Sequence, residues 1–294
     1  MATTLSASER REARDQVLTA GALIGPATIF VAAGLLVPIA ILFRYSLNDV
    51  GPYKQMIEAF TAANYLRFFS DPYYTTVLAR TLRVAVTCTL VCLLLGFPLA
   101  YVLARMQSQR KNWLIMLVVL PLFVGNAVRA AGWMALFGSK GVVNSLLMRI
   151  GLIDAPLEIM YTEVAVTIGI IAVNLPFMVL TLQSVIEGID RAVEEAAFSL
   201  GANPYHMARR VLLPLALPGL LAGSILTFIL AMNAYATPVL LGGPRFVMMG
   251  PLVYNQFVQQ NNWPFGASIS FVLMAATIVL TATANILVQR RYRR

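Results

Sequence analysis

The apolar residues of this chain fall into six long runs, separated by shorter stretches that are rich in polar and turn-forming residues. A membrane hydrocarbon core is about 30 Å thick, and an α-helix needs roughly 20 apolar residues to cross it. Each run reaches that length, so the pattern predicts six membrane-spanning helices. They are expected at 21–43, 84–104, 113–137, 164–185, 215–240 and 265–287.

The remaining sequence is divided around these runs. We expect an N-terminal tail at 1–20, a transmembrane domain at 21–288 and a short basic tail at 289–294. The first run is too long for the apolar core of a signal peptide, which predicts that it is retained as a membrane helix. The connection at 188–214, between the fourth and fifth runs, is expected to form a hairpin that belongs to the transmembrane domain.

Composition supports this fold class. Of the 294 residues, 59% are hydrophobic and 12% are charged, against about 45–50% and about 25% in an ordinary soluble domain. The chain is therefore expected to be an integral membrane protein. Cys88 and Cys92 lie four positions apart inside the second run, a spacing that fits no metal motif, so we expect them to be buried packing thiols.

The distribution of basic residues predicts the orientation. The formal net charge is +9, and 13 of the 22 Lys and Arg residues lie in the two tails and in the second-to-third and fourth-to-fifth connections. Eight lie in the other three connections, which are longer. Basic residues favour the cytoplasmic side of a membrane, so both termini and the 188–214 connection are expected in the cytoplasm. This clustering at the ends of apolar runs disfavours nucleic acid as a partner.

The 188–214 connection carries helix start and stop signals. Asp190 is a good N-cap for a first helix, and Gly201 supplies the left-handed residue that ends it. Asn203 followed by Pro204 is typical of the N-cap and first turn of a second helix. The sequence therefore predicts a helix, a tight turn and another helix.

The first helix of this hairpin has an unusual surface. Glu194 and Glu195 fall in its first turns, where the helix dipole favours negative charge. An apolar stripe recurs at helical spacing and consists of Val193, Ala196, Ala197 and Leu200. A loop that folds back on its own bundle is one interpretation. The small apolar residues beside paired acids favour the other, a docking element for a soluble partner.

The same connection resembles a family signature, the EAA motif of permease subunits in bacterial binding-protein-dependent ABC importers. The matching positions, with the spacing of that motif, are Glu195, Ala196, Ala197, Gly201, Val211, Leu213 and Pro214. The resemblance implies an all-α integral membrane protein with six transmembrane helices, the type I ABC importer (MetI-like) permease fold and a cytoplasmic coupling hairpin. In that family the first hairpin helix sits in a groove of the ATPase subunit. The residues expected to couple to the ATPase are Glu194, Glu195, Ala196, Ala197, Gly201, Ala202 and Asn203.

Other segments resemble the spermidine/putrescine-type permeases. They include NYLRFFSDPYYTTVLARTLRVA before and into the second run, LLLGFPLAYVLA within it and WPFGAS at the sixth run. This resemblance implies a polyamine-like solute, although relatives that import amino-acid-derived compounds or organophosphonates keep those alternatives open. It also implies the bacterial inner membrane, with its lipids, and three kinds of partner protein: a second permease subunit, two ATPase subunits and a periplasmic binding protein.

No motif in the chain predicts catalysis. No stretch matches G-x-x-x-x-G-K-[ST], the loop that cradles phosphates, so ATP and Mg²⁺ are expected on separate ATPase subunits. A single histidine, His206, and no carboxylate pair within a run leave no candidate metal site or acid/base dyad. We expect a non-catalytic subunit without a cofactor of its own. A secondary transporter, the alternative from another class, would need inverted repeats and membrane-embedded acids, and we find neither in the sequence.

Polar residues inside the runs are candidates for a translocation path, because polar groups in hydrocarbon are costly and usually face a cavity. The candidates are Asn126, Arg129, Asn174, Asn233, Tyr235 and Thr237. For each asparagine, an interhelical hydrogen bond that holds the bundle together is the competing interpretation. No Asp or Glu occurs in the six runs, so this chain offers a polycation no counter-charge there. Three interpretations stay open: the second permease subunit supplies the charge, the solute is bound only transiently and weakly, or the solute is not a polyamine. The absence of acids favours a second permease subunit of different sequence.

Overall fold

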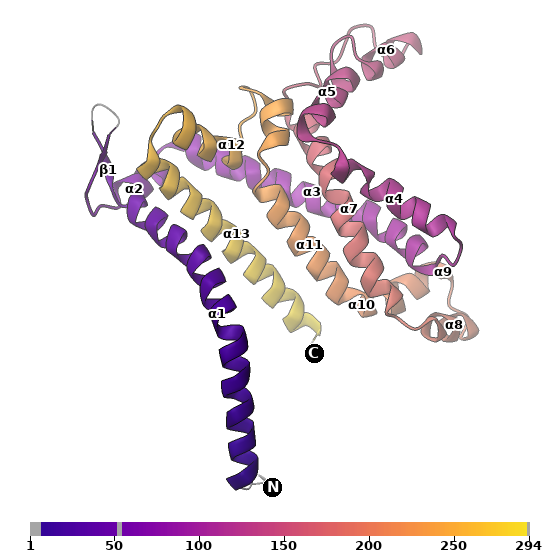
Figure 1. Cartoon of the computed structure of the whole chain (residues 1–294). Helices are drawn as coiled ribbons and strands as arrows, with labels where there is room; N and C mark the ends of the chain where they lie inside the picture. Colours follow the sequence, from indigo (N-terminus) through magenta and orange to yellow (C-terminus); the bar gives the residue numbers. More distant parts are fainter. Residues whose placement is uncertain (1–6, 52–54, 293–294) are drawn as a thin grey trace.

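The computed structural model describes residues 7–51 and 55–292, with side chains for 24–51 and 55–286. The described chain is a bundle of helices with one two-stranded hairpin (Figure 1). Its helices are α1 (Ala7–Ser46), α2 (Ala63–Ser70), α3 (Pro72–Arg105), α4 (Arg110–Phe123), α5 (Asn126–Phe137), α6 (Val142–Arg149), α7 (Glu163–Glu187), α8 (Arg191–Ser199), α9 (Pro204–Met207), α10 (Leu213–Leu215), α11 (Leu217–Met232), α12 (Met249–Tyr254) and α13 (Trp263–Tyr292). Three π-helical turns are η1 (Ala208–Leu212), η2 (Pro238–Gly242) and η3 (Asn255–Gln259), and the antiparallel strands are β1 (Asp49–Val50) and β2 (Met56–Ile57).

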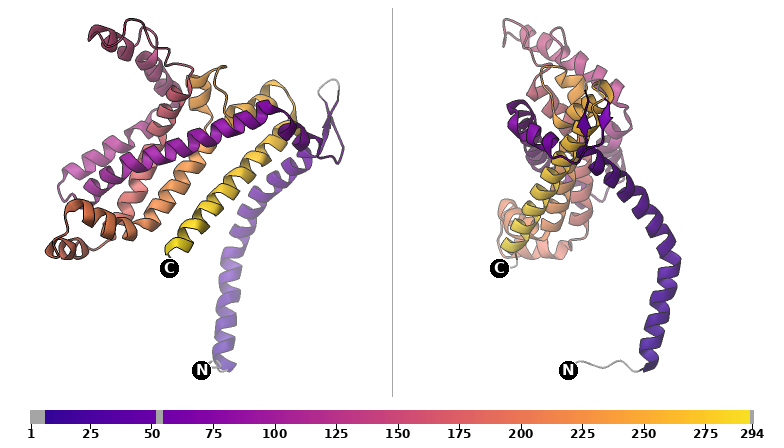
Figure 2. Two further views of the ribbon diagram at one scale, coloured as in Figure 1. Left: turned by 180° about the vertical axis from the view of Figure 1, so that it is seen from behind. Right: turned by 90° about the vertical axis from the view of Figure 1, so that its left-hand side faces the viewer.

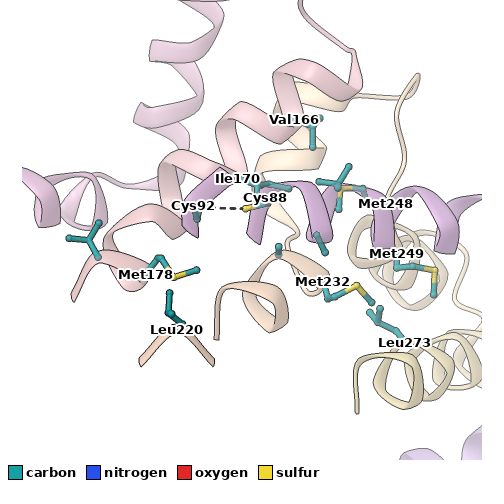
Figure 3. Packing of buried hydrophobic residues seen from close by; sticks show 14 of the residues in the cluster. Cys88, Cys92, Val166, Ile170, Met178, Leu220, Met232, Met248, Met249 and Leu273 are labelled. Atoms are coloured by element: carbon teal, nitrogen blue, oxygen red, sulfur yellow. Dashed lines mark hydrogen bonds between the residues drawn. The ribbon is translucent and has the colours of Figure 1, made fainter. Parts of the chain in front are cut away.

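Helices α3, α7 and α11 pack together as the core of the bundle. A Cβ at Gly219 of α11 would lie 2.8 Å from the Cβ of Val185 on α7, so glycine permits the close approach there. Small residues at such crossings suit membrane helices, which associate through van der Waals contact. Cys88 and Cys92 are free and fully buried in this core (Figure 3), which confirms the prediction of packing thiols.

Helix α1 diverges from the rest of the bundle. Its C-terminal part packs on α13, where the rings of Phe43 and Phe271 lie 5.3 Å apart edge to face. Its N-terminal part stands away from the other helices in both views of Figure 2, and Phe30 is 81% exposed. An apolar helix with such exposure is suited to a lipid environment.

The helix α1 begins at Ala7, so part of the segment expected as a separate tail continues the first span. Residues 1–6 of that expected tail lie outside the described residues, as do 293–294 of the C-terminal tail. Helix α13 likewise continues to Tyr292.

Four of the six predicted spans are continuous helices in the described residues. They are Ile24–Ser46, Pro72–Arg105, Glu163–Glu187 and Trp263–Ile286. The other two each consist of a pair of helices that is strongly bent at a short break, so the chain has six spans if each bent pair counts as one.

The prediction of one helix over 113–137 is wrong. The segments Arg110–Phe123 and Asn126–Arg149 meet at 98°. Pro121 lies in the last turn of α4, where its ring removes a backbone donor. Gly125 then adopts an extended conformation before α5 begins. The chain therefore turns at the position where the sequence suggested an uninterrupted span.

The prediction of one helix over 215–240 is wrong at its C-terminal end. Helix α11 ends at Met232. The side-chain amide of Asn233 donates to the backbone carbonyl oxygen of Ile229 at 2.9 Å and caps the helix. At the other end, the chain bends by 72° between Pro204–Leu215 and Leu217–Met232. Pro214 and Pro218 lie on either side of this bend, and a proline ring interrupts the helical hydrogen-bond pattern.

The connections gather at two ends of the bundle. In Figure 1 the start of α1, the end of α13 and the α8–α9 segment lie at one end, and the β1–β2 hairpin, α2, α6 and α12 lie at the other. The described start of α1, the end of α13 and the α8–α9 segment therefore lie toward the same end of the bundle.

Candidate functional site

The α8–α9 hairpin is built by local capping interactions. The Asp190 carboxylate accepts from the backbone N–H of Ala192 at 3.0 Å and starts α8. Gly201 has φ +81°, which is costly for residues with a Cβ. Asn203 then accepts from the backbone N–H of His206 at 2.8 Å and starts α9. The predicted helix, turn and helix are all present.

Two backbone hydrogen bonds close the turn itself. The N–H of Ala202 donates to the carbonyl of Ala197 at 3.0 Å, and the N–H of Gly201 donates to that of Phe198 at 2.9 Å. This pair of bonds is the Schellman motif, which satisfies the last carbonyl groups of a helix. The direction in which α9 leaves α8 is therefore set by backbone geometry.

The inner face of α8 is tied to the end of α3 by a buried ion pair. Glu194 is 7% exposed and forms a salt bridge with Arg105, whose Nε donates to Glu194 Oε1 at 2.8 Å. The hydroxyl of Tyr101 donates to Glu194 Oε2 at 3.0 Å. Arg191 adds a hydrogen bond of 2.6 Å to the backbone carbonyl of Arg105. Glu194 therefore joins the hairpin to its own bundle.

A second ion pair lies at the same end of the bundle. Lys111, at the start of α4, contacts the carboxylate of Glu187, at the end of α7, at 2.5 Å. The amide of Gln183 donates to the same carboxylate oxygen at 3.0 Å. Both side chains of this pair are partly exposed, so it is less enclosed than the Arg105–Glu194 pair.

The outer face of α8 is apolar and exposed. Leu200 is 89% exposed and Val193 is 40% exposed, and Ala196 lies on the same open surface. Ala197 is buried, which corrects the predicted apolar stripe: one of its four members points into the bundle. Glu195 is exposed, in contrast to its neighbour Glu194. The residues predicted to couple to an ATPase are thus divided between an inner anchor and an outer surface.

The residues predicted to line a path fall into three separate places. Asn174 is 3% exposed, and its amide donates to the Cys88 sulfur at 3.7 Å across the α3–α7 contact. That geometry is the interhelical hydrogen bond of the competing interpretation. Asn126 and Arg129 share a small pocket with Thr237, and Arg129 donates to the Val124 carbonyl at 2.6 Å.

Asn233 and Tyr235 line a different and much larger cavity, of about 620 Å³. It lies between the end of α11, the α12–η3 segment and α13. The ring of Tyr235 lies against that of Tyr254, with the centroids 4.8 Å apart. The break after α11 places both Asn233 and Tyr235 at this cavity.

Sequence reasoning missed three residues of these sites. The sequence indicates Arg105 only as one of the 13 basic residues whose distribution predicts the orientation, and Tyr101 lies one turn before it on α3. Their pairing with Glu194 joins positions about 90 residues apart, for which the sequence carries no local signal. Tyr254 lies in a connection that was not assigned a helix.

The described residues contain no group of three or more His, Cys, Asp or Glu side chains close enough to hold a metal ion.

A bundle of long apolar helices with a capped, charged hairpin fixed to one end is the architecture of an integral membrane protein. The chain belongs to the family of binding-protein-dependent transport system inner membrane components, whose profile matches residues 92–294. It is therefore a multi-pass protein of the inner membrane and a permease subunit of such a system.

Two curated relatives are similar over most of the chain. The spermidine/putrescine transport system permease protein PotB of Haemophilus influenzae is 38% identical over 234 residues, 79% of this chain and 82% of that protein. The PotB protein of Escherichia coli is 37% identical over 233 residues, with the same two shares.

Solved structures support the fold. A bacterial alginate ABC transporter in complex with an alginate pentasaccharide-bound periplasmic protein contains a chain that matches with a TM-score of 0.77 and 18% identity, covering 96% of this chain and 97% of that one. A bacterial ABC transporter involved in alginate import matches with a TM-score of 0.72 and 20% identity, covering 97% and 99%. At these identities the likeness shows the permease fold.

Proposed function

We propose that the chain is a permease subunit of an ATP-driven ABC importer and forms half of the translocation path for a polyamine-like solute. A periplasmic binding protein would deliver the solute at the end of the bundle that carries α2, α6 and α12. The substrate class is supported by the identity of 37–38% to two spermidine/putrescine permeases over about four-fifths of the chain.

The α8–α9 hairpin is the observation that carries the ATP-driven mechanism. Its inner face is fixed to α3 through Glu194 and Arg105, and its outer face presents Ala196 and Leu200 without cover from the rest of the described chain. An exposed apolar patch on a rigid support is typical of a protein interaction site. An ATPase subunit that engages this face in the cytoplasm would move the hairpin and α3 as one piece.

This arrangement assigns the chemistry to other chains. ATP and Mg²⁺ would be bound by two partner ATPase subunits, and this chain would be non-catalytic. The second half of the path would come from another permease subunit. We infer a different sequence for that subunit, because the six apolar runs of this chain contain no Asp or Glu to balance a polycation.

The test is ATP hydrolysis by the complex of this chain with its partner subunits, reconstituted in lipid with the binding protein. Polyamines, amino acids and organophosphonates would be compared as stimulants. We expect an ATPase to co-purify with the chain and spermidine or putrescine to raise its turnover. Stimulation by an amino acid or a phosphonate would overturn the substrate class. Failure of any ATPase to associate would overturn the importer and favour a secondary transporter.

A pair of variants locates the docking face. Leu200→Asp places a charge at the 89% exposed tip of α8 and is expected to reduce ATPase co-purification strongly, because it adds a charge to an apolar contact. Phe60→Asp alters a residue that is 83% exposed at the opposite end of the bundle and is the matched control. Equal loss of ATPase from both variants would contradict docking at the hairpin.

A further inference from the structure

The cavity beside α13 has a wall of aromatic and uncharged polar side chains. Asn233, Tyr235, Tyr254 and Phe257 are among the residues that line it. Its described lining contains no Lys, Arg, Asp or Glu. Tyr235 and Tyr254 are both about 40% exposed, so parts of their rings remain open to a ligand or to a partner subunit.

The hydroxyl groups that α13 contributes to the cavity all donate to backbone carbonyls of their own helix. Ser270 donates to the carbonyl of Gly266 at 2.8 Å, and Thr277 donates to that of Leu273 at 2.8 Å. Thr281 donates to the Thr277 carbonyl at 2.7 Å. A hydroxyl has one donor and two acceptor lone pairs. Each donor is therefore occupied by the helix backbone, and acceptor capacity is left.

Asn233 also keeps a spare acceptor. The side-chain amide nitrogen of Asn233 donates to the backbone carbonyl of Ile229 at 2.9 Å. Among the described residues, none donates a hydrogen bond to the side-chain carbonyl oxygen of Asn233. Spare acceptors without a basic side chain suit a ligand that brings N–H donors and positive charge. An anion would find no positive charge there, and its only side-chain donors besides the occupied hydroxyls of α13 would be the second amide hydrogen of Asn233 and the tyrosine hydroxyls.

The two tyrosines supply the attraction that a carboxylate would otherwise provide. A cation within about 6 Å of an aromatic face is held by the ring quadrupole, and this attraction grows when water is excluded. The remaining lining is aliphatic, including Leu273 and Met274, and suits methylene segments. Such contacts are individually weak, and a transported solute must be released after it is bound.

We propose that this cavity is the solute contact site of the chain, and that it takes a linear organic polycation whose ammonium groups lie over the rings of Tyr235 and Tyr254. The site deepens the proposed function and rests on it. It explains how a permease subunit without a membrane-embedded carboxylate contributes to a path for cations. The pocket that holds Arg129 is unsuited to this role, because its guanidinium would repel the solute.

The experiment is spermidine uptake by the complete complex in proteoliposomes, at saturating binding protein. Tyr254→Leu removes the aromatic face and is expected to lower the uptake rate about fivefold or more, whereas Tyr254→Phe keeps the face and stays within about twofold of wild type. Tyr73→Leu is the matched control, since Tyr73 is 50% exposed on α3 and does not line the cavity. Co-purification of the subunits checks assembly.

A graded substitution separates ring electrostatics from shape. Phenylalanine with one, two or three ring fluorines at position 254 keeps nearly the same shape but weakens the quadrupole stepwise, so uptake is expected to fall with each fluorine. Equal uptake across the series, or equal loss in Tyr254→Leu and Tyr73→Leu, would overturn the cation site. Wild-type complex that imports no polyamine would instead overturn the proposed function, which keeps the two failures apart.

Discussion

The hairpin and the α13 cavity are both candidate functional regions, but they are built in opposite ways. The hairpin consists of consecutive residues, 190 to 207, and its capping side chains accept hydrogen bonds from backbone N–H groups of the same segment. Its one buried acid, Glu194, is paired. The cavity draws residues from α11, α12–η3 and α13, and leaves acceptor groups unused. A joint that transmits force needs fixed geometry, while a site that must release its ligand needs weak contacts. The difference in hydrogen-bond satisfaction is the one expected from the roles proposed for the two regions.

The strongest test of the rigid joint removes its buried acid. Glu194→Ala leaves the Arg105 guanidinium without a counter-charge, and loss of one partner of a buried pair costs about 3–5 kcal/mol. We expect a large fall in the thermal stability of the detergent-purified complex and loss of solute-stimulated ATP hydrolysis. Differential scanning fluorimetry and an ATPase assay measure the two effects.

Its matched control is Glu195→Ala, because Glu195 is the exposed neighbour on the same helix turn. A surface substitution of this kind changes stability by less than about 0.5 kcal/mol. A charge reversal that combines Glu194→Arg with Arg105→Glu is expected to recover part of the stability. If Glu194→Ala were as stable as Glu195→Ala, the ion pair would not be the anchor.

A smaller effect is expected at the turn. Gly201 has φ +81°, and a Cβ there would meet no atom of the chain within 4 Å. Gly201→Val is therefore limited by backbone strain, about 1–2 kcal/mol, while Gly201→Asn is strained less because asparagine tolerates this region. We expect stimulated ATP hydrolysis to fall several-fold in the valine variant and to be mostly retained in the asparagine variant. Equal loss in both would show that absence of a side chain, and not the left-handed conformation, is what the turn requires.

The smallest effect is expected at the opposite end of the bundle. Arg83 and Glu163 form an ion pair between α3 and α7, but the Arg83 side chain is 62% exposed. Such pairs contribute at most about 1 kcal/mol and are screened by salt. Arg83→Gln should shift the midpoint of thermal unfolding only slightly, and less at high salt. A loss as large as that of Glu194→Ala would remove the contrast between the two ends.

Local signals account for what the sequence predicted well. The apolar runs locate the spans because their length alone is sufficient to cross a bilayer. Asp190, Gly201 and Asn203 locate the hairpin because caps and left-handed turns involve neighbours within about four residues. The buried state of Cys88 and Cys92 followed from their place within an apolar run.

The errors occurred where hydropathy is uniform but the backbone is not. The runs at 113–137 and 215–240 are apolar enough on average to read as single spans, yet the chain breaks near Gly125 and after Met232. Hydrophobic content does not distinguish a straight helix from a bent one, because both bury the same residues in lipid. The prediction that Ala197 belongs to the exposed stripe was wrong for a different reason. Helical spacing shows which residues share a face, but it does not show which part of that face packs against the bundle.

The sequence by itself determined the class of protein, the number of apolar segments and the helix, turn and helix of the hairpin, since these depend on composition and on contacts between near neighbours. Only the tertiary structure decided that Glu194 is anchored by Arg105, that Asn174 serves the α3–α7 contact, and that Tyr235 meets Tyr254 at a cavity. Those pairings join residues up to about 90 positions apart. They depend on how the helices cross, which no local pattern encodes, because the partners lie on different helices.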